Sequence, residues 1–498
     1  MENINLITRA KTLISLMTLA TVFLISACGQ KQEEFNDYSL FEDENTNSLE
    51  DSVKEEIHDQ VFAPNERVIP EGKIAKSVPP ANNAADLFTD ADLNVFEPFL
   101  NSSKSYCLIN EGYATPVFDR HEGSFFPYSL ISSIQSGYMM RKGIVPEIEP
   151  FDIICSLYHQ AAAGDESSEG FNVSGEVNKY GGYQQMLAGA FSLGAMNGYY
   201  LTDSTMYFDI TRYGETYTSE LSIDQIKELI KQKGALAAGV PSAYSFASDK
   251  NGYMTLNVTD RQKSYPTDEA VIVGWDDDFP AQFFDKQAKS DGAWLMQSSY
   301  SGGWGNKGFY WMSYETPIGY LLSNEVSEDL SDVITYSTMA FDEIRTEGET
   351  AVASIYRYPG NAAAIGLYTD SRDTTYTVEI SNGQFGDVIA SKQVTFKDIG
   401  YHTVWLDDPV SVSEFTVVVR STGGIMIEGS STDMFLSKAG AENGLPITEN
   451  AEYMITPTQG RSFVKIDGQW VDMTDDSTKQ YVRSNICPND PFITVMYK

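Results

Sequence analysis

Strict alternation of apolar and polar residues dominates the chain after about Asn324. The pattern is clearest in TTYTVEISNG, SKQVTFKDIGYHTVWLDD and FTVVVRSTGG. Because successive side chains of a strand point to opposite faces of a sheet, this period of two predicts antiparallel strands with one buried face. SFVKIDGQWVDM has the form of a hairpin that turns at Asp467-Gly468, and FITVMYK forms a final strand. We therefore predict an antiparallel β-sandwich domain over residues 325–498.

Residues 93–324 carry mixed signals. SLISSIQSGYMMRKG, which follows Pro127, has helical spacing, and IDQIKELIKQKGA is an amphipathic helix that ends at Gly234. EAVIVGWDD, AWLMQSSY and GFYWMSYE have the composition of strands separated by glycine turns. Helix followed by strands predicts an α+β domain. A chain of 498 residues is long enough for this domain and the next one.

The N-terminus has the features of a targeting segment. Arg9 and Lys11 precede an uncharged, mostly apolar stretch that is shorter than the roughly 20 residues of a membrane-spanning helix. That stretch ends in small residues directly before Cys28, which resembles a bacterial lipobox. We expect residues 1–27 to be a lipoprotein signal peptide and Cys28 to be lipidated, anchoring the protein on the extracytoplasmic face of the cell membrane. The polar, acidic residues 28–92 are predicted to be a flexible tether.

The net charge limits the classes of partner, and the cysteine content indicates whether disulfides hold the fold together. The formal net charge of -36 disfavours nucleic acid, whose phosphates repel such a field. Three cysteines follow Cys28, and their odd number and wide spacing do not indicate a disulfide framework. We expect Cys107, Cys155 and Cys487 to be small buried apolar residues, although one pair could form a bridge.

Three blocks of the first domain resemble the papain-like cysteine peptidases. TPVFDRHEGSFFPYS resembles the segment around the nucleophile, TDEAVIVGWDDD the histidine strand, and DGAWLMQSSYSGGWGNKGFYWMSYE the asparagine segment. Residues 325–498 resemble the lectin-like domain appended to some clostridial members of the family. The resemblance implies a two-lobed domain with a peptide-binding cleft between the lobes, followed by the lectin-like domain.

The residues that carry the family's chemistry are changed. Catalysis there needs a thiolate at a helix N-terminus, an imidazole to take its proton, and an amide to orient the imidazole. An ungapped alignment places Phe125 at the nucleophile and Ser298 at the asparagine. Asp268 takes the histidine position, counting back six from Gly274, or Glu269 does if a bulge shifts the register.

Two further family positions are also changed. The glutamine that stabilises the oxyanion corresponds to Arg120, with Asp119 as the other candidate. The tryptophan that shields the histidine corresponds to Tyr300. We therefore predict no catalytic residue and no metal or cofactor. The candidate ligand-binding residues in the cleft are Ser124, Phe125, Asp268, Tyr300 and Trp304.

Other chemistries remain open. Cys107 or Cys155 could be the nucleophile of an active peptidase, and Ser124 could act with His121. An Asp119–Asp268 carboxylate pair is a further candidate. The aspartates at 276–278 and at 407–408 are interpreted as solvated loops rather than calcium ligands.

The expected function is binding rather than hydrolysis. The sequence indicates a membrane-anchored, catalytically inactive papain-like homologue that holds an extended peptide or a surface protein in its cleft. The lectin-like domain is a candidate for glycan binding through exposed aromatics such as Tyr401, Trp405 or Trp470. The alternative is an active cysteine endopeptidase of the papain family with a non-standard site.

Overall fold

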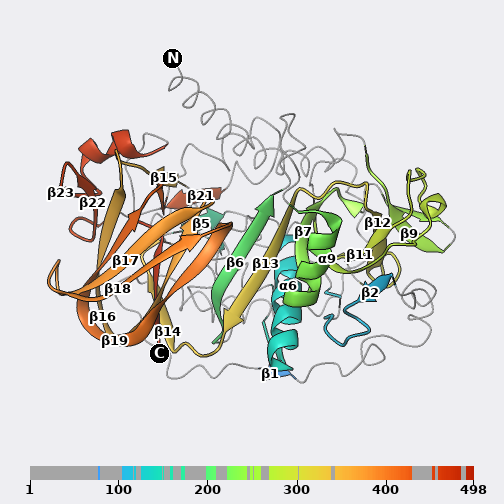
Figure 1. Ribbon diagram of the computed structural model, residues 1–498, viewed down its shortest axis with the longest axis horizontal. Coiled ribbons are helices and arrows are strands. Elements are labelled where there is room, and N and C mark those ends of the chain that lie inside the picture. The colour runs from blue at the N-terminus through green and yellow to red at the C-terminus, as the bar shows by residue number, and fades with distance from the viewer. Residues whose placement is uncertain are drawn as a thin grey trace, which may run out of the picture.

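The structure is a computed structural model that describes a defined part of the chain (Figure 1). The described residues are 77–78, 104–115, 117–118, 125–148, 150, 158–160, 170–173, 198–208, 221–243, 247–250, 252–259, 268–300, 302–337, 342–428, 451–454, 458–483 and 490–498. The predicted signal peptide, Cys28 and nearly all of the predicted tether lie outside them. This part of the chain is mostly β-sheet with few helices.

Two α-helices confirm the helical predictions. Helix α6, Phe125–Lys142, begins two residues before Pro127, which is tolerated in a first turn. Helix α9, Ile223–Lys233, starts with a capping box between Ser222 and Gln225 and stops at Gly234, whose φ is 92°. Two short 3-10 helices span Ala281–Phe283 and Asp476–Tyr481. None of the helices in the described part of the chain combines the length and apolar character that a membrane span requires.

Strand β10, Asp268–Asp276, is the centre of the sheet in the first half. It pairs on one side with β11, Ala293–Gln297, and on the other with β7, Leu236–Val240, and β2, Ser105–Cys107. The sheet continues from β11 through β12, Phe309–Ser313, β9, Tyr253–Leu256, and β8, Ser248–Lys250. All nine residues of β10 are buried, and this explains the run of apolar residues in its sequence.

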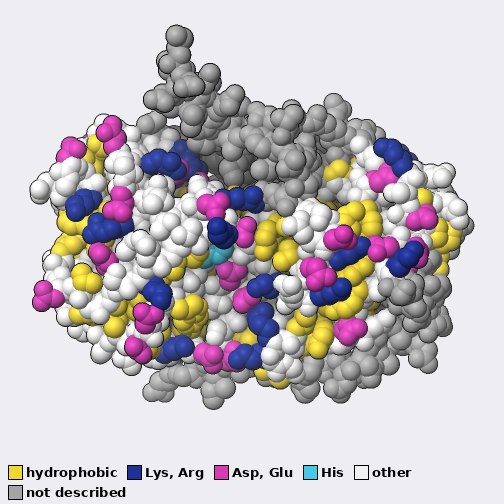
Figure 2. All heavy atoms as spheres, in the orientation of Figure 1, with side chains coloured by type: hydrophobic (Ala, Val, Ile, Leu, Met, Phe, Trp, Pro, Cys, Tyr) yellow, Lys and Arg dark blue, Asp and Glu magenta, His cyan; other side chains and the backbone are white. Residues whose placement is uncertain are grey.

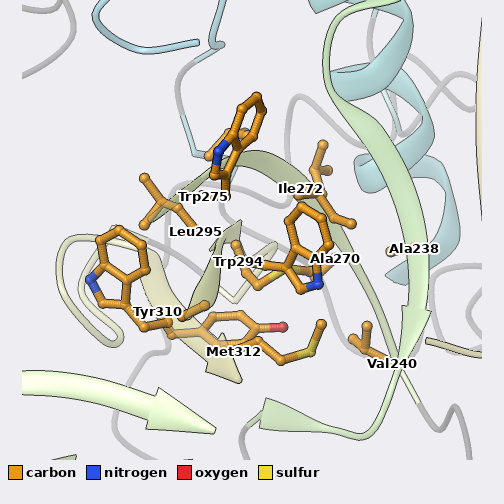
Figure 3. Packing of buried hydrophobic residues seen from close by; sticks show 14 of the residues in the cluster. Ala238, Val240, Ala270, Ile272, Trp275, Trp294, Leu295, Tyr310 and Met312 are labelled. Carbon is orange, nitrogen blue, oxygen red and sulfur yellow. The ribbon is translucent and has the colours of Figure 1, made fainter. Parts of the chain in front are cut away.

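Large aromatic side chains fill the core of this half (Figure 3). Trp294 and Trp311 are at most 1% exposed, and Trp275 on β10 is 4% exposed. The ring of Trp311 stacks on Phe279 at 4.7 Å between centroids. Helix α6 packs against β10, β7 and β13, Tyr320–Ser327, on the same side of the molecule as this core.

The sheet runs without a break into the second half. Strand β13, Tyr320–Ser327, pairs with β7 and with β6, Tyr200–Phe208, and β6 pairs in turn with β19, Ile399–Ser421. The predicted boundary between residues 324 and 325 therefore lies inside β13. Strands from both halves form the junction in Figure 1.

Two long strands organise the second half. Strand β16, Thr350–Thr369, pairs with β19 along both of its halves, and all pairings around them are antiparallel. Their neighbours are β17, Thr374–Asn382, β18, Val388–Phe396, β22, Ser462–Ile466, β23, Gln469–Asp472, β24, Ile493–Tyr497, and β14, Asp332–Thr335. The hairpin of β22 and β23 confirms the predicted turn, since Asp467 and Gly468 have φ of 49° and 81°.

Smaller strand groups complete the fold. They are β1, Ser77–Val78, with β3, Val145–Pro146; β4, Tyr158–Gln160, with β5, Gly170–Val173, and β21, Ala451–Met454; and β15, Asp342–Ile344, with β20, Ile425–Ile427. On the face shown in Figure 2, basic side chains are interspersed among acidic ones, although the whole chain has a net charge of -36.

The lengths of the alternating segments differ from the sequence-based expectation. SKQVTFKDIGYHTVWLDD is divided between β18 and β19, because the chain reverses direction between Phe396 and Ile399. Strand β19 then continues through Pro409, which lies where its register against β16 shifts. A shift of this kind tolerates the missing proline N–H.

Candidate functional site

A buried carboxylate and two hydroxyl groups form the candidate site. The hydroxyl of Tyr300 donates a hydrogen bond to Asp268 Oδ2, and Ser242 Oγ lies 3.1 Å from the same hydroxyl. Asp268 is only 5% exposed, at the first position of β10, opposite Val240 of β7. Ser242 lies two residues after the end of β7, so the pairing of β7 with β10 brings the three side chains together.

The register decides which of two adjacent carboxylates belongs to this site. A β-bulge does occur in β10, but it lies between Ile272 and Gly274, beyond the acidic pair. Asp268 is the residue that contacts Tyr300, and its Oδ1 also accepts the backbone N–H of Glu269 at 2.9 Å. Glu269 is 2% exposed, and alternation directs it to the other face of the strand.

Ser298 shapes the turn that presents Tyr300. Its Oγ accepts the backbone N–H of Tyr300 at 3.0 Å, and its own N–H donates to the Gly308 carbonyl at 2.8 Å. Gly308 has φ of 88°, and a Cβ there would meet Val117 at 2.6 Å, so the tight turn needs glycine. Ser298 thus acts on the site through the backbone of Tyr300.

Aromatic rings line the site on one side. Tyr300 and Trp304 have ring centroids 5.2 Å apart, and Trp304 meets Tyr310 edge-on at 5.7 Å. Burial, together with the nearby charge of Asp268, raises the pKa of Tyr310 well above its usual value. Tyr310 therefore keeps its proton, and its hydroxyl has no hydrogen-bond partner in the described part of the chain.

The structure brings some of the predicted residues together and leaves others undescribed. Asp268, Ser298, Tyr300 and Trp304 lie in one connected group. Phe125 is the first residue of α6, and its side chain lies outside the described set. Arg120 and Ser124, with Asp119, His121 and Cys155, also fall outside it.

Two residues of the site were missed by sequence reasoning. Ser242 follows a strand without any motif of its own, so only the pairing of β7 with β10 reveals it. Tyr310 lies in GFYWM, where it was assigned only to a strand. An aromatic residue in a strand carries no signal that separates an ordinary core ring from one that packs beside a functional site.

Cys107 does not have the surroundings of a nucleophile. It is a free thiol on β2, 3% exposed, and pairs with Gly274 of β10. Burial raises its pKa from 9.0 to about 12. A thiol with that pKa is protonated at neutral pH and does not attack a carbonyl.

The acidic loop after β10 is held by ion pairs. Lys227 Nζ lies 2.5 Å and the Tyr314 hydroxyl 2.8 Å from Asp277 Oδ1, while Lys104 binds Asp278 at 2.8 Å. Across the described ranges, no group of three or more His, Cys, Asp or Glu side chains is placed to hold a metal ion.

The aromatics considered for sugar binding differ in exposure. Tyr401 is 1% exposed, so the prediction that it is an exposed aromatic was wrong; its place on the inner face of β19 explains the burial. Trp405 is 39% exposed, with Lys498 Nζ 5.0 Å from its ring centroid. Trp470 is half-buried on β23.

Comparisons with known proteins agree with this architecture. Residues 340–487 match the family model described as "Lectin like domain". The fold of the chain resembles that of a clostridial cysteine protease with a lectin-like domain.

Two solved structures carry that likeness. One is a variant of the clostridial cysteine protease Cwp84 after propeptide cleavage, with a TM-score of 0.59, 15% identity, and coverage of 79% of this chain and 99% of the other. The second contains the cysteine protease and lectin-like domains of Cwp84, a surface layer associated protein of Clostridium difficile. It has a TM-score of 0.58 and 16% identity, and covers 80% of this chain and 88% of that one. At this identity the likeness shows the fold alone, and no curated protein matches the chain significantly.

Proposed function

We propose that this protein is a membrane-anchored, catalytically inactive homologue of the papain-like cysteine proteases that binds ligands at the cell surface. Residues 93–324 form the two-lobed papain arrangement in this proposal, with α6 in one lobe and β10 to β12 in the other. Cys28 carries the lipid anchor, and residues 28–92 tether the two domains to the membrane.

One observation carries the proposal. At the strand position where the resemblance expects an imidazole, Asp268 stands buried and accepts a hydrogen bond from Tyr300. A carboxylate held in this way fixes the ring of Tyr300, and the aligned nucleophile position carries Phe125, which has no ionisable proton to give up. The described cysteine, Cys107, is protonated by burial, which supports the absence of an activated thiolate there.

The cleft is proposed to bind an extended peptide or a segment of a surface protein. Papain-type grooves hold such ligands through main-chain hydrogen bonds, which do not require the catalytic residues. Phe125 provides an apolar contact at the start of α6, and Asp268, Tyr300 and Trp304 provide polar and aromatic contacts. The lectin-like domain adds a glycan-binding surface.

Binding and hydrolysis are separated by one pair of measurements. The full chain is screened by fluorescence anisotropy against a library of labelled peptides and, in parallel, against the same peptides as fluorogenic substrates. We expect binding without cleavage, and we expect Phe125→Ala to weaken binding by about tenfold, as for the loss of a buried apolar contact. Cleavage by the wild-type protein, or binding that ignores Phe125→Ala, would contradict the proposal.

Restoring the three catalytic residue types of the papain-like peptidases tests whether these positions are aligned correctly with that family. The triple variant Phe125→Cys, Asp268→His and Ser298→Asn places a thiol, an imidazole and an amide at the three positions. We expect a thiol-reactive peptidase probe to label this variant and not the wild type. The matched control uses Glu269→His in place of Asp268→His, which directs the imidazole to the other face of β10 and leaves labelling at background.

A further inference from the structure

The loop between β17 and β18 presents an aromatic ring to solvent. Phe385 is 36% exposed, and its backbone has φ of 56°, a conformation that a bulky residue rarely adopts. The flanking glycines make the loop possible. Gly383 also has φ of 56°, and a Cβ at Gly386 would come within 2.3 Å of the Asn382 carbonyl oxygen.

Hydrogen bonds fix this loop against β19. The Phe385 N–H donates to Thr416 Oγ1 at 3.0 Å, and Thr416 Oγ1 donates to the Gly383 carbonyl at 2.8 Å. The ends of the loop close through the Asn382 N–H, which donates to the Asp387 carbonyl at 3.0 Å. Because the ring is held in place beforehand, a ligand that stacks on it loses little additional conformational entropy.

Two more aromatic rings support Phe385 on the outer face of the sheet. Phe463 meets it edge-on at 5.4 Å between centroids, and Trp470 lies at 5.2 Å with a tilt of 32°. Val464, the neighbour of Phe463 on β22, points into the core and is fully buried, so alternation places Phe463 on the opposite face. We call Phe385, Phe463 and Trp470 the aromatic platform; Phe463 lies on β22 and Trp470 on β23, and Figure 1 shows these two strands at the opposite end of the view from β9.

Planar polar side chains lie beside the platform. Glu414 Oε1 accepts hydrogen bonds from Gln384 Nε2 at 3.3 Å and from Arg357 Nε at 3.0 Å. Gln384 directly precedes Phe385, and the Gly383 N–H donates to the Glu414 carbonyl at 2.8 Å, which ties this rim to the loop. The side chains of Arg357 and Glu414 are 69% and 45% exposed, so their remaining donors and acceptors face solvent.

We infer that the aromatic platform and its polar rim bind a hexopyranose unit of a cell-surface polysaccharide. A pyranose has one face of C–H groups, which packs on an aromatic ring, and a circle of hydroxyls, which pair with planar amides, carboxylates and guanidinium groups. All six residues lie within the region that matches the lectin-like family model. The inference rests on the glycan-binding part of the proposed function and names the surface that performs it.

The dimensions of the patch favour a sugar over a protein. A stable protein interface buries roughly 1,000 Å² or more around a central apolar cluster. Here one ring is more than a third exposed and charged or amide groups adjoin it directly, which matches a single sugar ring. The platform is tied to β19 through the Phe385 N–H, which binds Thr416, and to β16 through the pairing of Phe463 with Ala353, so the test has to separate ligand stacking from packing.

The experiment uses the full chain and a panel of immobilised oligosaccharides built from hexoses and N-acetylhexosamines in α and β linkages. We expect at least one oligosaccharide to bind, and Phe385→Leu to weaken that binding by about tenfold, because leucine keeps the apolar cover but removes the ring. Glu414→Ala is expected to weaken it similarly. Ile223→Ala, which truncates an exposed apolar side chain on α9, outside the platform, is the matched control and should leave binding unchanged.

Measurements of thermal stability and of peptide binding show whether a loss of oligosaccharide binding comes from lost stacking, from a less stable fold or from the cleft. Equal thermal unfolding midpoints for Phe385→Leu and the wild type assign the loss of binding to stacking. Binding of no oligosaccharide, or equal binding by Phe385→Leu, would overturn the inference. Oligosaccharide binding that survives Phe125→Ala, while peptide binding does not, shows that the two sites are independent, so failure of the cleft proposal leaves this site standing.

Discussion

His402 Nδ1 lies 2.8 Å from Asp203 Oδ1, across the line where the two halves of the molecule share one sheet. His402 is on β19 and Asp203 is on β6, and the two residues are also register partners. The second ring nitrogen lies 3.0 Å from the Asp398 carbonyl oxygen, and the imidazole stacks on Phe396 at 4.7 Å. This histidine is a structural link between the halves and has no place in the candidate site.

Removal of the His402 side chain should weaken the junction. His402→Ala loses two hydrogen bonds and a ring contact, and we expect it to lower the free energy of unfolding by about 2 kcal/mol. Chemical denaturation of the full chain measures the change. Lys397→Ala, which removes an exposed ion pair with Asp373, is the control and should cost less than about 0.5 kcal/mol. Similar values for both variants would show that the junction does not depend on His402.

The buried hydrogen bond from Tyr300 to Asp268 should contribute more to the free energy of unfolding than a solvent-exposed hydrogen bond does. Tyr300→Phe removes a donor from a carboxylate that is 5% exposed. We expect a loss of about 1–3 kcal/mol in unfolding free energy, because a buried acceptor is left with fewer donors. Tyr113→Phe, at a half-buried tyrosine packed on the same core, is the matched control. If Tyr300→Phe and Tyr113→Phe are equally stable, the hydrogen bond from Tyr300 to Asp268 does not stabilise the fold.

Local signals in the sequence predicted the elements of the fold well. Helix α9 was predicted from its amphipathic spacing and Gly234, and the structure adds a capping box at Ser222; all of these act within a few residues. The turn at Asp467-Gly468 is equally local, since it depends on two residues that accept positive φ.

Pairings between distant segments were not predictable in the same way. The contact of β6 with β19 joins residues about two hundred positions apart, and no local pattern encodes it. The candidate site likewise combines residues that local motifs reveal with one that only a strand pairing reveals. Asp268, Ser298 and Tyr300 were found by counting along motifs, whereas Ser242 enters only because β7 pairs with β10.

Asp276 should make stability depend on pH. It is 1% exposed at the end of β10, and burial raises its pKa from 3.8 to about 6, with the adjacent Asp278 and Asp277 adding to the shift. Because the unfolded chain gives up this proton more readily, the residue lowers stability as pH rises from about 4 to 6, and the penalty is complete above pH 6. Below pH 4 both states are protonated and the penalty disappears.

Asp276→Asn removes that penalty while its side-chain oxygen can still accept the Asp278 N–H at 2.8 Å. We expect the variant to be more stable than the wild type by about 1 kcal/mol at pH 7.5, and equally stable near pH 4. Thermal unfolding at a series of pH values measures the difference. A stability gain that does not change with pH would mean that the ionisation of Asp276 is not its cause.

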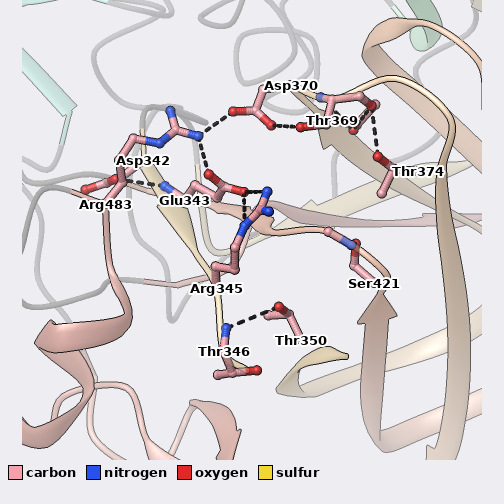
Figure 4. Close-up of polar contacts among 12 residues, drawn as sticks. Asp342, Glu343, Arg345, Thr346, Thr350, Thr369, Asp370, Thr374, Ser421 and Arg483 are labelled. Atoms are coloured by element: carbon pink, nitrogen blue, oxygen red, sulfur yellow. Dashed lines mark hydrogen bonds and ion pairs between the residues drawn. The ribbon is translucent and has the colours of Figure 1, made fainter. Parts of the chain in front are cut away.

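Arg483 holds two acidic residues together in the lectin-like half (Figure 4). Its guanidinium binds Glu343 Oε2 at 2.6 Å and also binds Asp370, while Arg345 binds the other oxygen of Glu343 at 2.7 Å. The Glu343 side chain is only 9% exposed. Arg483→Ala leaves this carboxylate with one cation fewer, and we expect a loss of about 2–3 kcal/mol in unfolding free energy.

A second substitution separates charge from packing at this cluster. Glu343→Gln in the Arg483→Ala background removes a buried charge that has lost one of its two cations, so the double variant should be more stable than Arg483→Ala alone. A double-mutant cycle gives the coupling energy between the two residues, which we expect to be about 1–2 kcal/mol. Strictly additive losses would indicate that the ion pair contributes nothing beyond the packing of the two side chains.

The reactivity of Cys107 separates binding protein from peptidase most directly. The thiol is 3% exposed and burial raises its pKa to about 12, so we expect it to resist alkylation in the native protein at pH 7.5 and to react once the chain unfolds. Iodoacetamide labelling followed by mass spectrometry of the peptide that contains Cys107 gives its rate separately from the other cysteines. A catalytic thiol would react faster in the folded state than in the unfolded one, because its surroundings would stabilise the thiolate. Fast native labelling of Cys107 would therefore favour an active enzyme, whereas protection by folding excludes Cys107 as its nucleophile.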